Sequence, residues 1–121
     1  MKKNNPLLQK SFQFSIQIIE YTEKLNELKK YSFVNQLFRS GTAIGAMVRE
    51  AQSPESLNDF IHKLKIAAKE AEESMYWLEL AETSMHYPSP SNEGLIKPLN
   101  EIQKLLSAII KTSKDKLKAN R

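Results

Sequence analysis

Apolar residues recur at spacings of three and four along most of the chain, which is the period of one face of an α-helix. The longest such pattern covers residues 57–85, with strong helix formers between its members. These members are Leu57, Phe60, Leu64, Ala67, Ala71, Ser74, Leu78, Ala81 and Met85. Ser53 and Pro54 suit an N-cap and a first helical position, and residues 87–90 contain two prolines that end the pattern. We therefore predict a long helix over residues 54–86.

The same spacing predicts two further helices. One is carried by Val34, Leu37, Gly41, Ile44, Val48 and Ala51. The other is carried by Leu95, Leu99, Ile102, Leu106 and Ile109. Pro98 lies inside the second pattern, so that helix is expected to kink there or to become regular only afterwards.

The beginning of the chain is ambiguous over a short window. Residues 12–18 alternate apolar and polar, which alone is typical of a half-buried strand. The longer window favours a helix, because the helical spacing continues through Phe14, Ile18, Tyr21, Leu25 and Leu28. A second apolar stripe, formed by Leu8, Phe12 and Ile19, marks the same helix.

Four helices near residues 7–29, 32–52, 54–86 and 91–118 result, joined by short connections. Short connections place neighbouring helices antiparallel. We therefore predict an all-α protein, an antiparallel up-down-up-down four-helix bundle in which residues 1–121 form a single domain.

Composition narrows the classes of function. The chain has 121 residues, a net charge of +4 and no cysteine. The lack of cysteine excludes thiol catalysis, zinc–thiolate sites and iron–sulfur clusters. No apolar segment follows the first residues as in a signal peptide, and none is long enough to span a membrane. We expect a cytoplasmic protein without a membrane partner.

Two groups of residues offer possible acid–base or metal chemistry. Asp59 and His62 lie one helical turn apart, like half of a di-iron site, but the sequence contains no second pair of this kind, and a solvated helix flank is the favoured interpretation. An acidic run comprises Glu70, Glu72, Glu73, Glu79 and Glu82. Two of these carboxylates in a dry pocket would suit acid–base chemistry. Ion pairs from Glu70 and Glu73 to Arg39 or Arg49 are the favoured interpretation. We expect no catalytic residue, metal or cofactor.

Gly41 and Gly45 lie four residues apart within a predicted helix, where each glycine costs about 1 kcal/mol relative to alanine. Close approach of a neighbouring helix is the favoured explanation, and a binding pocket beneath the small side chains is the alternative. The spacing is not a phosphate-binding loop, because no Lys-Ser/Thr pair follows it.

The C-terminal segment 111–121 is strongly basic. Its cations are Lys111, Lys114, Lys116, Lys118 and Arg121. Lysines near a helix C-terminus complement the helix dipole, and this structural interpretation stays open. Clustered cations also bind nucleic acid by releasing counterions from its phosphates, which makes these five residues the candidate nucleic-acid-binding residues.

Residues 39–51, 60–67 and 69–78 together resemble a bacterial protein family. This family comprises the four-helix-bundle proteins encoded in intervening sequences of bacterial 23S ribosomal RNA genes, and it includes the accessory variability determinant proteins of diversity-generating retroelements. The resemblance extends over essentially the whole chain. It implies a cytoplasmic bundle that assembles into a ring, with the pentamer as the family's known form, and it implies RNA, DNA or a reverse transcriptase as partners for retroelement members. The matched residues have the character of a structural signature, namely Arg39, Gly41, Gly45, Glu50, Glu70 and Tyr76.

Taken together, we expect a non-enzymatic homo-oligomer that binds nucleic acid or a nucleic-acid enzyme through a basic rim. We call each row of apolar residues at helical spacing a seam. Apolar residues outside the seam of residues 57–85 support the assembly, namely Ile61, Tyr76, Trp77 and Leu80. The alternative is a metal-dependent or RNA-cleaving helical-bundle enzyme. Bundle ribonucleases of the HEPN kind carry a histidine about six residues after an arginine, and no histidine lies within ten residues after Arg39 or Arg49.

Overall fold

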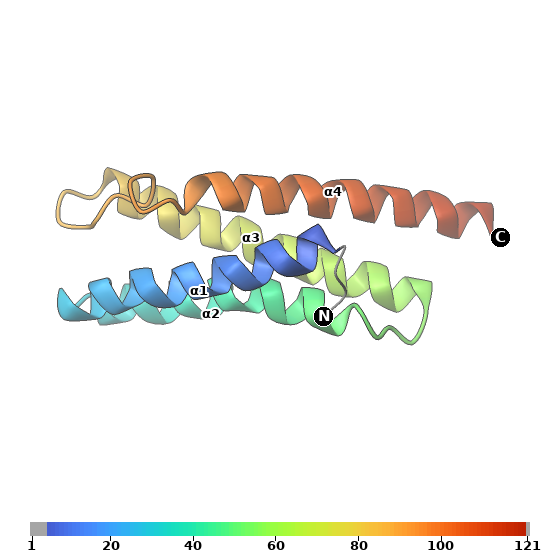
Figure 1. Ribbon diagram of the computed structural model, residues 1–121, viewed down its shortest axis with the longest axis horizontal. Helices are drawn as coiled ribbons and strands as arrows, with labels where there is room; N and C mark the ends of the chain where they lie inside the picture. Colours follow the sequence, from blue (N-terminus) through green and yellow to red (C-terminus); the bar gives the residue numbers. More distant parts are fainter. Residues whose placement is uncertain (1–4, 121) are drawn as a thin grey trace.

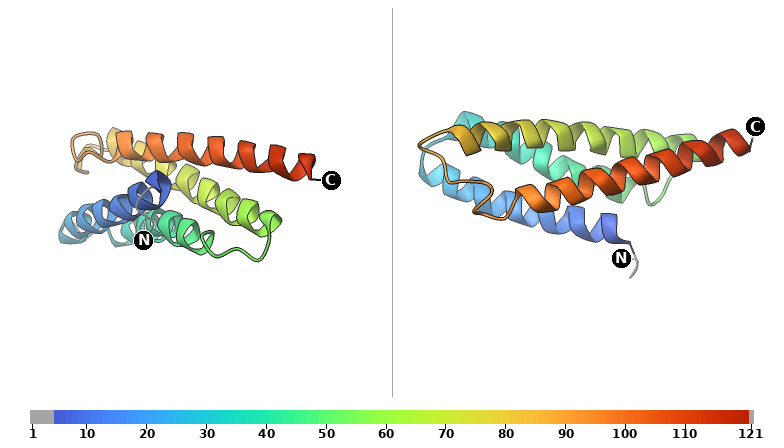
Figure 2. Two further views of the ribbon diagram at one scale, coloured as in Figure 1. Left: turned by 45° about the vertical axis from the view of Figure 1, so that its right-hand side comes forward. Right: turned by 90° about the horizontal axis from the view of Figure 1, so that it is seen from above.

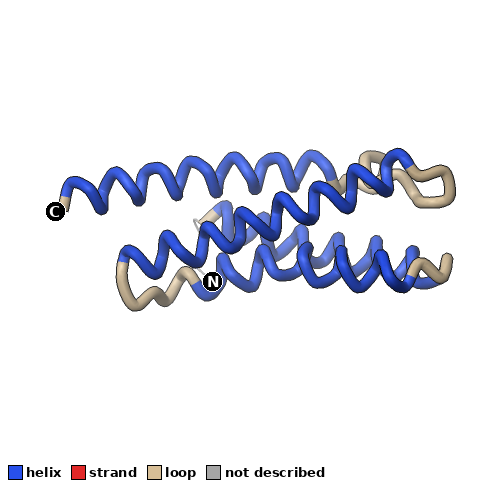
Figure 3. The backbone as a smooth tube through the Cα atoms, turned by 180° about the vertical axis from the view of Figure 1, so that it is seen from behind, coloured by secondary structure: helices blue, strands red, loops and turns tan. Residues whose placement is uncertain are grey.

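The chain folds into four α-helices in a computed structural model that describes residues 5–120. The helices are α1 (Pro6–Glu27), α2 (Tyr31–Glu50), α3 (Leu57–Thr83) and α4 (Ile96–Ala119). Figure 3 shows helices and loops, and no strand occurs among the described residues. The predicted all-α class is confirmed, and the alternating residues 12–18 belong to α1. None of the helices in this part of the chain is long and apolar enough to cross a membrane.

Each helix packs against the next one in the sequence. The contacts between α1 and α2, α2 and α3, and α3 and α4 are extensive, and a smaller contact joins α1 to α4. Figure 1 shows that the chain reverses its direction at each of the three loops. The C-terminal end of α4 extends beyond the other helices in both Figure 1 and Figure 2.

The core consists largely of the predicted helical seams. All six seam residues of α2 and its following turn are buried, as are Leu95, Leu99, Ile102 and Leu106 at the start of α4. The seams are wrong at two helix ends, because Leu28 is 48% exposed and Met85 is 89% exposed. Leu8, predicted to lie on a second stripe, is only 5% exposed and belongs to the core. Where no neighbouring element covers a helix end, the seam residues at that end are exposed to solvent.

The glycines of α2 allow close approach of α1. A Cβ on Gly45 would lie 3.1 Å from the backbone oxygen of Ser11 and 3.1 Å from the hydroxyl of Ser15. At Gly41 the neighbouring side chain is Ile18, also of α1. The predicted close packing is confirmed at both positions, and it explains why helix-weakening residues occupy them.

Two helices begin later than predicted. The N-cap of α3 is Ser56, whose hydroxyl accepts the backbone N–H of Asp59 at 3.0 Å. The Asp59 carboxylate in turn accepts the N–H of Glu55 at 3.1 Å, so this pair of caps fixes the start of α3 and leaves Pro54 outside it. Helix α4 begins at Ile96, which places Pro98 in the first turn, where its missing N–H leaves no acceptor unsatisfied.

The loop between α3 and α4 is fixed by side chains from two helices. The hydroxyl of Tyr21 donates to the carbonyl of Pro88 at 2.8 Å. The carboxylate of Glu82 accepts hydrogen bonds from the hydroxyls of Ser89 and Ser91 and from the backbone N–H of Ser91. Burial raises the pKa of Tyr21 above its ordinary value, and the three donors lower the pKa of Glu82. The loop is therefore an ordered part of the fold.

Candidate functional site

A row of lysines follows one exposed flank of α4, which we call the lysine face. It comprises Lys104, Lys111, Lys114 and Lys118, whose spacings of seven, three and four place them on one side of a helix. Near the end of the helix, a shallow cavity of about 320 Å³ is lined by Ser107, Ile110, Lys111, Lys114, Asp115 and Lys118. Three of the five predicted nucleic-acid-binding residues thus share one surface.

The other two predicted residues are not on this surface. The position of Lys116 in the helical repeat is roughly 150° away from its lysine neighbours, at 100° per residue, and Arg121 lies outside the described residues. Part of the charge of the lysine face is neutralised, because the ammonium of Lys111 lies 3.4 Å from the carboxylate of Asp115. Both groups of that pair are exposed to water, so the pair is weak.

Helix α3 adds a lysine that sequence reasoning missed. The positive charge of Lys65 lies beside the ammonium of Lys114, and this repulsion lowers the pKa of Lys114 below its ordinary value. The two residues are far apart in the sequence and come together only because α3 packs against α4. Nothing in the helical periodicity of α3 alone distinguishes Lys65 from a solvated lysine. Two adjacent ammonium groups suit an anion between them, such as a phosphate.

Ion pairs join the outer edges of α2 and α3. Arg39 lies 3.3 Å from Glu73, as one of the predicted alternatives has it, and Lys63 lies 2.9 Å from Glu50. The hydrogen bond that the Lys63 ammonium donates to the Glu50 carboxylate raises the pKa of Lys63. Glu70 makes neither predicted pair, and its Oε1 atom is buried without a hydrogen-bond partner. The acidic run is therefore mainly structural on this side of α3.

The pair of Asp59 and His62 also has a structural explanation. The Asp59 carboxylate caps the preceding backbone, as described above, and His62 is exposed. Within residues 5–120, no group of three or more histidine, aspartate or glutamate side chains is arranged to hold a metal ion.

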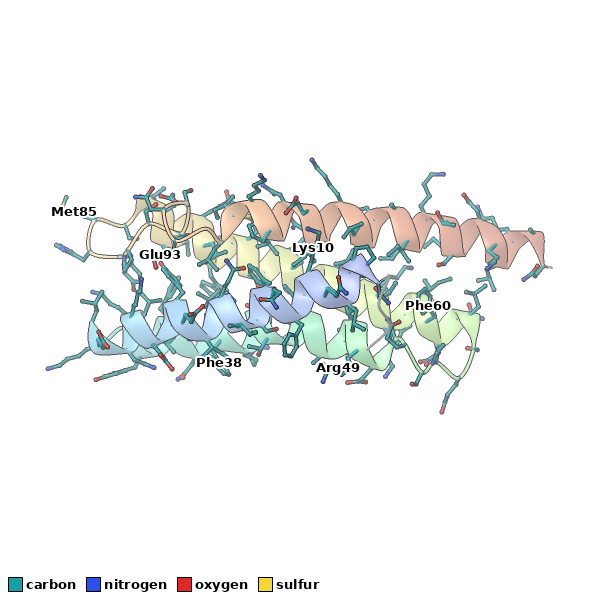
Figure 4. The ribbon with its side chains drawn as sticks, in the orientation of Figure 1. Lys10, Phe38, Arg49, Phe60, Met85 and Glu93 are labelled. Atoms are coloured by element: carbon teal, nitrogen blue, oxygen red, sulfur yellow. The ribbon has the colours of Figure 1, made fainter. Side chains whose placement is uncertain are left out.

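An apolar surface covers the outside of α1 and α2, and we call it the α1–α2 face. Phe12 and Ile19 are each 40% exposed, and Ile16 and Phe38 are similarly exposed. A hollow of about 440 Å³ opens on this face and is lined by Leu8, Phe12, Ser15, Gly45, Ala46, Arg49 and Glu50. The guanidinium carbon of Arg49 lies 5.5 Å from the centre of the Phe12 ring. In Figure 4, Phe38 and Arg49 lie along the edge of α2 that is remote from α4.

A second apolar surface lies on α3. Tyr76 is 57% exposed and Leu80 is 39% exposed, as expected for residues outside the seam. The other two predicted residues behave differently: Ile61 is buried, and Trp77 packs edge-on against Phe33 with ring centres 5.9 Å apart. Aromatic packing at the bundle edge thus accounts for Trp77, and the exposed surface is smaller than predicted.

The remaining residues of the predicted signature have structural positions. Gly41 and Gly45 contact α1, whereas Arg39 and Glu50 form the ion pairs between α2 and α3. Tyr76 makes an edge-on contact with Trp77, at 5.2 Å between ring centres. The signature therefore describes helix packing with one exposed aromatic residue.

Comparison with known proteins identifies the family of this chain and a similar solved structure. Residues 3–108 match the family described as 23S rRNA-intervening sequence protein. A crystal structure of a protein of unknown function from the S23 ribosomal protein family of Bacteroides thetaiotaomicron is similar, with 42% sequence identity and a TM-score of 0.82. The similarity covers 87% of this chain and 98% of that one. No curated protein matches the chain.

Proposed function

Because this chain belongs to the family of 23S rRNA-intervening sequence proteins, we propose that it is a non-enzymatic homo-oligomer that binds RNA or DNA through the lysine face. The expected assembly is a pentameric ring of up-down-up-down four-helix bundles in the cytoplasm. A reverse transcriptase is a further expected partner if the gene belongs to a retroelement.

The apolar residues on the outside of the bundle support the assembly. The α1–α2 face exposes four large apolar side chains, and the outer side of α3 exposes Tyr76 and Leu80. Contiguous exposed apolar surface of this kind marks interaction sites, and aromatic residues are enriched in them. The two surfaces differ in their residues and lie on different helices. Contacts between unlike surfaces are heterologous, and such contacts close into a ring when each copy is rotated by a fixed angle from the last.

The single observation that carries nucleic-acid binding is the clustering of Lys65 with the lysines of α4. Ammonium groups that repel each other in the free protein gain from an anion placed between them, and a nucleic acid supplies a row of phosphates. The end of α4 extends beyond the other helices, so a ring brings several copies of this cationic end together on one rim. Repetition multiplies the charge that one copy offers.

The assembly is tested first by light scattering of the native protein at micromolar concentration. A mass of about five times 13.9 kDa is expected, and a mass of 13.9 kDa would overturn the assembly. Binding to labelled duplex RNA and DNA is then measured as a function of salt, with a gel showing that the RNA stays uncleaved. We expect affinity to fall steeply with salt, because phosphate contacts release counterions.

The lysine face is tested with a matched pair of variants. The double substitution Lys111→Glu with Lys114→Glu removes charge from the lysine face, whereas Lys29→Glu with Lys116→Glu makes the same charge change at exposed positions away from that face. The first is expected to lower affinity at least about tenfold relative to the second and to flatten the salt dependence. Equal losses in the two variants would show that only net charge matters and would overturn the proposed face.

A further inference from the structure

A carboxylate on α3 lacks the partner that its neighbours have. Glu70 lies between Lys63 and Glu73, which both pair with residues of α2. Seven residues on from the pair of Glu50 and Lys63, the antiparallel register places Ala43 beside Glu70, and alanine offers no side-chain donor. The Oε1 atom of Glu70 is buried and has no hydrogen bond within the described residues. A buried carboxylate oxygen in this state is unfavourable unless a donor reaches the group.

A cation on the α1–α2 face is in the opposite situation. Arg49 is exposed, and among the described residues no carboxylate lies within ion-pairing distance of it. Its guanidinium instead lies over the ring of Phe12. The ring restricts the side chain and keeps the guanidinium group on an apolar surface. Among the described residues, Arg49 on α2 thus has no ion-pair partner, and Glu70 on the adjacent helix α3 has a buried oxygen without a donor.

The two groups also lie at the same level along the bundle. Helical side chains lean toward the N-terminus of their own helix. Arg49 therefore leans toward Gly45 on α2, and Glu70 leans toward Ile66 on α3. The register of the two helices sets Gly45 opposite residue 68 of α3, between Ile66 and Glu70. A second copy that is related to the first by rotation about an axis parallel to the helices can therefore bring its Glu70 to the level of Arg49. No translation along the bundle is needed.

From this complementarity we propose that, in the assembly, Arg49 of one copy donates hydrogen bonds to the Glu70 carboxylate of the next copy. The α1–α2 face of the first copy then covers the side of the second copy on which α2 packs against α3, and Phe12 and Ile16 are buried beside the ion pair. The proposal rests on the proposed homo-oligomer and specifies which surfaces meet in it. It leaves the lysine face on α4 uncovered, because α4 contributes to neither surface.

The proposal is tested by charge reversal and exchange. Arg49→Glu and Glu70→Arg are each expected to raise the concentration at which half of the protein dissociates by about 30-fold or more, since each leaves like charges facing across the contact. The double variant carrying both substitutions restores the opposite charges and is expected to recover assembly. Lys10→Glu is the matched control, because Lys10 pairs with Glu101 of α4 on another side of the bundle.

The outcomes separate this proposal from the oligomer itself. A native protein that is monomeric overturns both. A native oligomer that tolerates both single reversals, or one that the double variant fails to restore, overturns the ion pair and leaves the assembly standing.

A second variant covers the case in which Glu70→Arg does not fold. Glu70→Met removes the unpaired carboxylate without adding charge. In the dissociated background of Arg49→Glu it is expected to raise the melting temperature, whereas in the native background it weakens assembly. A residue with a purely structural role within one copy would change both readouts in the same direction, and that result would also overturn the proposal.

Discussion

The side chain of Ile18 occupies the space that a side chain on Gly41 would need. A Cβ on Gly41 would lie 2.7 Å from Cγ1 of Ile18, closer than non-bonded carbon atoms approach. Ile18 is fully buried on α1, so it has no free space to move into. The distance between α1 and α2 is therefore set by the absence of a side chain at position 41.

We predict that Gly41→Leu destabilises the protein by about 3 kcal/mol or more in free energy of unfolding, because overpacking forces both helices apart. Gly41→Ala loses less, since alanine recovers about 1 kcal/mol of helix propensity. Chemical denaturation measures both values. Ala108→Leu, at an exposed position of α4, is the control for a leucine added to a helix. A loss for Gly41→Leu no larger than for this control would contradict the close contact.

A second prediction concerns the hydrogen bond between two buried serines. The hydroxyl of Ser74 donates to the hydroxyl of Ser40 at 2.9 Å, and Ser40 also contacts the carbonyl of Leu37 at 3.4 Å. Ser40→Ala leaves the buried Ser74 hydroxyl without its acceptor and is expected to cost about 1–3 kcal/mol. Replacing both serines by alanine removes the unsatisfied group as well. The double variant is therefore expected to lose less stability than the two single losses added together, and strict additivity in a denaturation series would rule out the coupling.

Helical periodicity identified the core more reliably than the helix ends. The seam of α2 was predicted correctly at every position, because a half-buried helix must show its period in its own sequence. The start of α3 was not, because residues 53–56 contain two serines that can cap a helix. The choice between them depends on Asp59, whose carboxylate reaches back to Glu55 and stabilises the later start.

The candidate site was predictable only within one helix. The spacing of Lys111, Lys114 and Lys118 already places them together on one flank of α4. Lys65 joins them through the packing of α3 on α4, and no pattern local to α3 encodes that register. For the same reason, the sequence offered Glu70 and Glu73 as equal partners for an arginine, and the structure pairs only Glu73.

A third prediction uses the hydrogen bonds that lower the pKa of Glu82. A carboxyl group with a lowered pKa in the folded state stabilises that state above its unfolded value, and this contribution is lost as the pH falls from near 4.5 through the lowered pKa. Glu82→Gln removes the titration. We expect the melting temperature of the native protein to fall more than that of the variant over this acidic range, while the variant is already less stable at neutral pH. Parallel pH profiles of the two proteins would contradict a stabilising role for these hydrogen bonds.

The last prediction concerns Lys114 and connects the electrostatics of the free protein to its proposed ligand. Because the neighbouring charge of Lys65 lowers the pKa of Lys114, replacing that neighbour in Lys65→Ala should raise the pKa toward its ordinary value of 10.5. Nuclear magnetic resonance of the lysine side chains measures this titration directly. Lys97, near the other end of α4, serves as the internal reference. Addition of a short nucleic-acid duplex to the native protein should also raise the pKa of Lys114, since a phosphate beside the ammonium favours its charged form. If the pKa of Lys114 rises in Lys65→Ala but does not change when the duplex is added, Lys65 and Lys114 do interact. That result would contradict phosphate binding between them.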